Sequence, residues 1–190
     1  TFNNRIGYGC ERAIRQLMKD IRDVSRGYTR DAYIITRDIR AYFPSTDLQR
    51  TYDMYRELIE RNIPEGEERG DLLYILQRVT YMYPSRHVRL LSPPHDYEDI
   101  RKAGKSVIFN CDDGHGACLG NQFWQVQKNY ELADFDRWQV VECGMRYGRF
   151  VDDMWWVVYN LQAGLAHVAH SEKVLREQYG FEMHPRKRYQ

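Results

Sequence analysis

The chain has 190 residues, a net charge of +1 and 43% hydrophobic residues, which predicts one domain around one hydrophobic core. Its apolar stretches are shorter than the roughly 20 residues of a membrane span, and its four scattered cysteines disfavour a zinc knuckle or a disulfide framework. No signal-peptide pattern opens the chain. We therefore expect a cytoplasmic protein with no membrane partner, and the chain ends suggest a fragment of a longer protein.

The charge is distributed unevenly. Residues 1–50 carry ten Lys or Arg against six acids, whereas residues 51–100 carry six against ten. A basic N-terminal third is suited to following a phosphate backbone. A solvated helix face explains the same residues, so both interpretations stay open here.

The first predicted elements are a helix and a strand. Apolar residues recur at helical spacing over residues 10–26, and Gly27 ends this amphipathic helix. β-Branched and aromatic residues over 32–37 predict a short strand that leads directly into Asp38. The first acidic candidate therefore stands at a strand end.

The middle of the chain combines helices with an irregular stretch. A helix is expected after Thr46, whose hydroxyl would form a capping box with Gln49. Residues 71–83 predict a further helix. Prolines and glycines make residues 84–118 irregular, with a short strand expected at 107–109.

The C-terminal part predicts a helix, a β-hairpin and another helix. The first helix follows Gly120 and breaks near Asp134. The hairpin surrounds Asp152 and Asp153, and the second helix spans residues 165–178. Helices mixed with a few antiparallel strands place the chain in the α+β class.

The adjacent carboxylates of Asp152 and Asp153 carry the strongest chemical signal. Aspartates repel one another and form strands poorly, so this pair requires open solvent or a bound cation. Asp38 would join them if its strand is a neighbour of the hairpin in one sheet. Such a cluster is suited to two Mg²⁺ ions roughly 3.5–4 Å apart, which assist phosphoryl transfer. Catalysis would then depend mainly on positioning and charge neutralisation.

Five segments resemble the motifs of reverse transcriptases of the bacterial and phage lineages, and together they span nearly the whole chain. They are FNNRIGYG at 2–9, DIRAYF at 38–43, GACLGNQFWQ at 116–125, FVDD at 150–153 and GFEMHPRKRYQ at 180–190. The chain is most similar to the enzymes of diversity-generating retroelements, with retron enzymes close behind. The resemblance implies a polymerase right-hand palm, with an antiparallel sheet packed on helices, plus partial fingers and no thumb.

The resemblance implies a metal site and its ligands. Asp38 and Asp152 would ligate both ions, Asp153 would assist or orient them, and the Ile39 carbonyl would add a ligand. The cofactor would be two Mg²⁺ ions, with Mn²⁺ as a substitute.

The resemblance also implies a set of nucleotide-binding residues. Arg5 would contact the triphosphate, Phe43 would block a ribose 2′-hydroxyl, Gly120 would allow close backbone approach, Gln125 would donate a hydrogen bond nearby, and Lys187 would neutralise the departing pyrophosphate. A core aromatic remains the alternative for Phe43, and solvated surface groups remain the alternative for Arg5 and Lys187.

The chain departs from the family pattern at two positions. Cys118 stands where proline is usual, and Trp124 stands where serine is usual, which would place an indole beside the nucleotide or template. The first functional hypothesis is a bacterial or phage-encoded RNA-directed DNA polymerase that uses an RNA template, a DNA or RNA primer and dNTPs, with room for an accessory protein. The alternatives are an antiphage polymerase with little template dependence, or a degenerate palm that serves as a nucleic-acid or protein interaction module.

Overall fold

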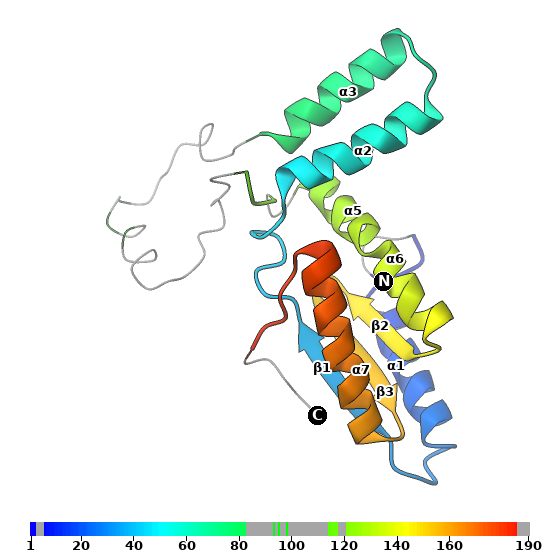
Figure 1. Cartoon of the computed structure of the whole chain (residues 1–190). Helices are drawn as coiled ribbons and strands as arrows, with labels where there is room; N and C mark the ends of the chain where they lie inside the picture. The colour runs from blue at the N-terminus through cyan, green and yellow to red at the C-terminus, as the bar shows by residue number, and fades with distance from the viewer. Residues whose placement is uncertain are drawn as a thin grey trace. The chain divides into compact units, whose positions relative to one another are not determined.

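A computed structural model describes most of the chain, namely residues 1–2, 6–82, 93, 95, 98, 114–117 and 121–185. The described residues form helices and a three-stranded antiparallel sheet, which confirms the α+β class. The chain divides into two units. The first consists of Thr1–Arg40 and Gln125–Gln190, and the second of Ala41–Trp124 (Figure 1). The single domain expected from the sequence stays a prediction, and the strand expected at 107–109 lies outside the described residues.

The first unit is built on the sheet. Its strands are β1 (Tyr33–Asp38), β2 (Arg146–Phe150) and β3 (Asp153–Val158), in the order β1-β3-β2. The central strand β3 pairs antiparallel with both neighbours, and its tryptophans, Trp155 and Trp156, are buried on opposite faces. The predicted first strand and the predicted hairpin are both confirmed.

Helix α1 (Cys10–Val24) packs on one face of the sheet, against β2 and β3. Ala13 on the helix is buried together with Trp155 and Val157 on β3. The helix ends three residues before Gly27, which has φ +69°. The apolar spacing predicted the helix, because residues three and four apart share one side of a helix. Of its apolar residues, Ile14 and Met18 are exposed and do not belong to the contact face.

Helix α7 (Leu161–Val174) and the π-helical turn η3 (Leu175–Tyr179) cover the opposite face, and Figure 1 shows α7 lying over the sheet. A Cβ atom on Gly164 would lie 2.6 Å from Val158 Cγ2 and 2.9 Å from Ile35 Cδ1, so glycine permits this close packing. The helix begins four residues before the expected start because the Asn160 side chain caps it.

Three short helical segments precede the hairpin. They are α5 (Gln122–Glu131), α6 (Ala133–Arg137) and the π-helical segment η2 (Trp138–Glu142). The predicted break near Asp134 is confirmed close by, since Leu132 separates α5 from α6.

A buried polar network joins η2 to β3 and α7. Gln139 accepts a hydrogen bond from Trp156 Nε1 at 2.9 Å and donates one to Ser171 Oγ at 2.8 Å. Its Oε1 also lies 2.7 Å from His167 Nε2. Buried polar side chains require such partners, so the network fixes how these elements pack.

The second unit contains α2 (Leu48–Asn62) and α3 (Glu67–Thr80), which pack side by side in Figure 1. The expected capping box is wrong. Asp47 caps α2 by accepting the Arg50 N–H at 2.9 Å, while the Thr46 hydroxyl donates to a carbonyl earlier in the chain. Among the described residues, no helix is both long enough and apolar enough to cross a membrane.

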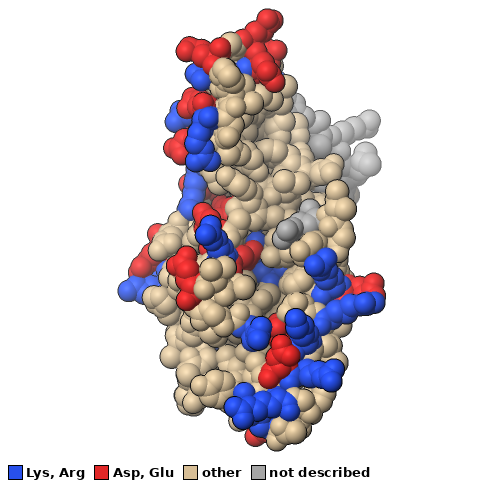
Figure 2. All heavy atoms as spheres, turned by 90° about the vertical axis from the view of Figure 1, so that its right-hand side faces the viewer, with Lys and Arg blue, Asp and Glu red and all other residues tan. Residues whose placement is uncertain are grey.

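Helix α3 begins four residues before its predicted start, at Glu67. Acidic residues occupy its first turn, where they interact favourably with the positive end of the helix dipole. Apolar spacing alone misses that polar first turn. Figure 2 shows acidic groups gathered at the end of the second unit that carries the α2–α3 connection.

Candidate metal centre

The end of β1 meets the β2–β3 hairpin. Asp38, the last residue of β1, stands directly opposite Asp153, the first residue of β3. The Ile39 N–H donates to the Asp152 carbonyl at 3.1 Å. Because that pair is hydrogen-bonded, the adjacent pair of Asp38 and Asp153 occupies a non-hydrogen-bonded position, where opposite Cα atoms lie about 4.5 Å apart. The two strands are neighbours in one sheet, which is the condition on which the predicted convergence depended.

The hairpin turn consists of Val151 and Asp152. Val151 has φ +58°, a left-handed conformation that a β-branched residue rarely adopts. Such a conformation costs about 1–3 kcal/mol and persists only where surrounding contacts impose it. The turn that presents Asp152 is therefore held in place by contacts outside the hairpin itself.

The three carboxylates differ in burial. Asp38 is buried, with 6% of its surface exposed, whereas Asp152 is half-buried and Asp153 is exposed. In an extended residue the N–H and C=O point to the same edge, so the Ile39 carbonyl faces the hairpin as its N–H does. The site thus offers carboxylate and carbonyl oxygens that range from buried to exposed.

The opposite edge of β1 contacts the segment after η3. The Asp38 carbonyl accepts the His184 N–H at 2.7 Å, and Arg40 donates its N–H to the Glu182 carbonyl at 2.7 Å. This bridge brings the C-terminal segment alongside the strand end that carries Asp38. Lys187, three residues further on, lies outside the described residues.

The donor set suits a hard divalent ion that substrate would help to hold. Within the described parts of the chain, no group of three or more Asp, Glu, His or Cys side chains is arranged to hold a metal ion. Mg²⁺ is usually bound by one or two carboxylates together with waters and substrate phosphates. Asp38 and Asp153, with the Ile39 carbonyl nearby, match that pattern in donor type.

The predicted nucleotide-binding residues fall in different parts of the chain. Gln125 is half-buried on α5, in the first unit. Phe43 belongs to the second unit, where its carbonyl accepts the Ala117 N–H at 2.8 Å. The start of the second motif therefore lies beside the end of the first. Arg5 and Gly120 lie outside the described residues.

The aromatic side chains of the second unit form its core. Phe43 is half-buried against the cluster of Leu48, Ala117 and Trp124. This packing matches the core-aromatic alternative, and selection against a ribose 2′-hydroxyl stays a prediction. Only 2% of the Trp124 surface is exposed, so its indole fills the core of the second unit and does not stand open to a ligand.

Comparison with models of known protein families and with curated protein sequences finds no match to this chain. The resemblance to reverse transcriptases therefore rests on the five sequence segments. The geometry of the carboxylates is a separate observation.

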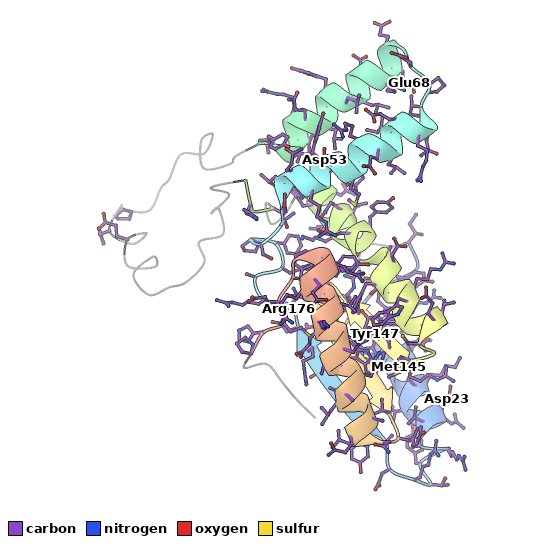
Figure 3. All side chains as sticks on the ribbon, viewed as in Figure 1. Asp23, Asp53, Glu68, Met145, Tyr147 and Arg176 are labelled. Carbon is purple, nitrogen blue, oxygen red and sulfur yellow. The ribbon has the colours of Figure 1, made fainter. Side chains whose placement is uncertain are left out.

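Sequence reasoning missed a buried ion pair behind the hairpin. Arg149 is fully buried and binds Asp136 through two hydrogen bonds of 2.9 Å each. It also donates to the Val151 carbonyl at 2.8 Å. Tyr147, labelled in Figure 3, donates its hydroxyl to the same Asp136 carboxylate at 2.8 Å. An arginine within a buried strand signals that an acidic partner exists, but no sequence spacing identifies Asp136.

Four of the basic side chains of the N-terminal third lie exposed on α1. Arg12, Arg15, Lys19 and Arg22 are exposed, and Figure 2 shows Lys and Arg side chains gathered over the part of the first unit that contains this helix. Arg15 forms an ion pair with Glu11 on the same helix. The face suits a phosphate backbone, and it is also a solvated helix face, so both interpretations remain.

Proposed function

We propose that the chain is the fingers and palm region of an RNA-directed DNA polymerase of the diversity-generating retroelement or retron type. It would add dNTPs to a primer 3′-hydroxyl by a nucleotidyl transfer that depends on two divalent ions. The observation that carries the proposal is the register that sets Asp38 opposite Asp153, beside a strained turn that carries Asp152.

The carboxylates would divide the work according to their burial. The buried Asp38 has few orientations open to it, so it would fix the position of the ions relative to the sheet. Asp152 would be the second shared ligand, and the exposed Asp153 would orient the site toward substrate. When bound, Mg²⁺ or Mn²⁺ would activate the primer hydroxyl and neutralise charge on the phosphates.

The arrangement of the first unit supports a polymerase palm. A small antiparallel sheet carries the acidic residues at one end, and helices α1 and α7 pack on its two faces. The sheet supplies rigid backbone for the ligands, and rigidity matters because nucleotidyl transfer is catalysed mainly by positioning and charge neutralisation. Template RNA, a DNA or RNA primer and dNTPs are the proposed substrates.

The interaction-module alternative depended on two residues, Trp124 and Cys118, as signs of a degenerate nucleotide site. One of them, Trp124, has another explanation. Trp124 packs in the hydrophobic core of the second unit, where a large side chain has a structural role. Cys118 lies outside the described residues.

Primer extension tests the proposal. The full-length parent protein would be assayed with an RNA template, a primer, dNTPs and Mg²⁺, beside the double variant Asp152→Asn, Asp153→Asn. Asp47→Asn is the matched control, because it removes one carboxylate charge at an exposed helix cap where asparagine serves equally well.

We expect template-dependent extension by the parent and by Asp47→Asn, and none by the double variant. Extension without a template would favour the antiphage polymerase. Absence of extension by the parent, or full activity in the double variant, would contradict the proposal.

A further inference from the structure

We infer that Arg149 and Asp136 form a clamp that holds the hairpin turn in its strained conformation and so positions Asp152 and Asp153. The clamp as a structural device stands on the geometry alone. Its consequence for metal binding rests on the proposed function. Arg149 is thus assigned as a positioning residue, one that acts through the backbone of the turn.

The hydrogen bonds of Arg149 divide between two targets. Its Nε and one terminal nitrogen bind the two oxygens of Asp136, each at 2.9 Å. Its other terminal nitrogen donates to the Val151 carbonyl at 2.8 Å. The planar guanidinium has its donors in a fixed fork, so binding Asp136 in this way also fixes the direction of the third donor.

The Val151 carbonyl belongs to the peptide that joins Val151 to Asp152. Holding that oxygen fixes the orientation of the whole peptide plane, because the peptide bond is planar. It therefore opposes rotation of this peptide, which would change ψ of Val151 and φ of Asp152, and so restrains the turn whose first residue has φ +58°. The same turn sets the Asp152 carbonyl 3.1 Å from the Ile39 N–H, so a relaxed turn would also disturb the link between the hairpin and β1.

The clamp approaches the hairpin from behind. Arg149 stands opposite Met154, whereas Asp153 is one residue earlier on β3 and opposite Asp38. Adjacent residues in a strand point to opposite faces of the sheet, so the guanidinium lies on the face away from Asp38 and Asp153. Arg149 thus supports the turn without being placed to touch the reacting groups.

Burial makes the clamp sensitive to loss of either partner. The Arg149 side chain is fully buried and Asp136 is 13% exposed, so neither charge is easily hydrated once the other is removed. Tyr147 adds a further hydrogen bond to Asp136, which itself is carried by helix α6. The clamp therefore ties the turn to a helix outside the β2–β3 hairpin.

Hydrogen exchange followed by mass spectrometry tests the clamp without reference to activity. The variants are Arg149→Met, Asp136→Asn and Arg149→Lys. The control is Lys128→Met, which breaks a comparably buried ion pair with Glu131, 3.0 Å long, on α5. We expect faster exchange at the amides of residues 150–154 in all three clamp variants, beyond any general loss of protection, and unchanged relative protection there in Lys128→Met.

Arg149→Lys distinguishes a fork from a simple charge pair. A lysine keeps the charge but lacks the planar fork that reaches Asp136 and the Val151 carbonyl together. Normal protection of residues 150–154 in this variant would overturn the inference, as would equal loosening of the hairpin in Lys128→Met.

Mn²⁺ binding, measured by electron paramagnetic resonance, tests the consequence for the site. Loss of a group that orients metal ligands typically weakens affinity by roughly 10- to 100-fold, and we expect at least about 10-fold for Arg149→Met. Unchanged affinity in Arg149→Met would overturn the positioning role. If the parent protein binds no Mn²⁺, the proposed function fails, and the exchange data still decide whether the clamp exists.

Discussion

Replacing Asp153 by asparagine should stabilise the protein while abolishing its activity. Asp153 stands opposite Asp38 in a non-hydrogen-bonded pair, so the side chains lie about 5 Å apart. Two unit charges at that separation repel by about 0.8 kcal/mol in water. Removing one charge should therefore raise the free energy of unfolding by about 0.5–0.8 kcal/mol, since salt screens part of the repulsion.

Divalent ions should reverse the order of stability, so that the parent becomes more stable than Asp153→Asn. An ion that binds only the folded state stabilises it by about 1.4 kcal/mol at ten times its Kd. The parent should gain this stability on addition of Mg²⁺, whereas Asp153→Asn should gain much less. In primer extension the variant should lose at least about 100-fold in rate, because metal ions contribute several kcal/mol to stabilisation of the transition state.

Urea unfolding in EDTA and in Mg²⁺ measures both effects on the same preparations. Asp47→Asn supplies the control, because it removes an equal charge at a helix cap that lies outside the three-stranded sheet. Lower stability of Asp153→Asn in EDTA, or an equal response to Mg²⁺ in the variant and the parent, would refute the reasoning.

Four further substitutions test packing and burial in the two units. In chemical denaturation, Gly148→Ala should lower the free energy of unfolding by about 1–3 kcal/mol, because the new Cβ would lie 2.0 Å from Trp155 Cζ2. Gly70 lies inside a helix, and a Cβ there would have no neighbouring atom within 4 Å, so Gly70→Ala should instead raise the free energy of unfolding by about 0.5–1 kcal/mol. Trp124→Ser should cost about 3–5 kcal/mol in thermal unfolding, because the indole is buried, and a gain of activity without loss of stability would show that the position serves the nucleotide. Burial, with a smaller contribution from His170, lowers the pKa of His167 from its usual 6.5. The folded state therefore binds fewer protons than the unfolded state, and the free energy of unfolding should fall as the pH drops below about 6.5. His167→Gln should flatten this pH dependence in urea unfolding at several pH values, and an unchanged pH dependence would show that His167 does not cause it.

Local periodicity predicted much of the first unit. The apolar spacing of α1 and the apolar and aromatic runs on either side of the Asp152-Asp153 pair are properties of neighbouring residues, and the structure has both elements. The position of Asp38 at a strand end followed from the strand itself. The pairing of β1 with β3 was predicted only as a condition, because strand pairing joins residues that are far apart in sequence.

Features that depend on competition between neighbouring side chains, or on partners far apart in the sequence, were harder to predict. Thr46 and Asp47 are both good caps, and the Thr46 hydroxyl instead donates to the Phe43 carbonyl, which leaves the cap to Asp47. The sequence gives no sign of the partner of Arg149, since Asp136 lies on a helix that is separated from it by a π-helical segment. Buried ion pairs of this kind leave no periodic signal in a sequence.

The proposed function requires that the end of β1 and the hairpin together bind divalent ions. Titration of the full-length protein with Mn²⁺, followed by electron paramagnetic resonance in the presence of a dNTP, tests it most directly when Asp38→Asn is measured beside the parent. We expect two bound ions, magnetically coupled, in the parent and loss of the coupled pair in Asp38→Asn. Absence of specific binding in the parent, or identical spectra for the two proteins, would contradict it.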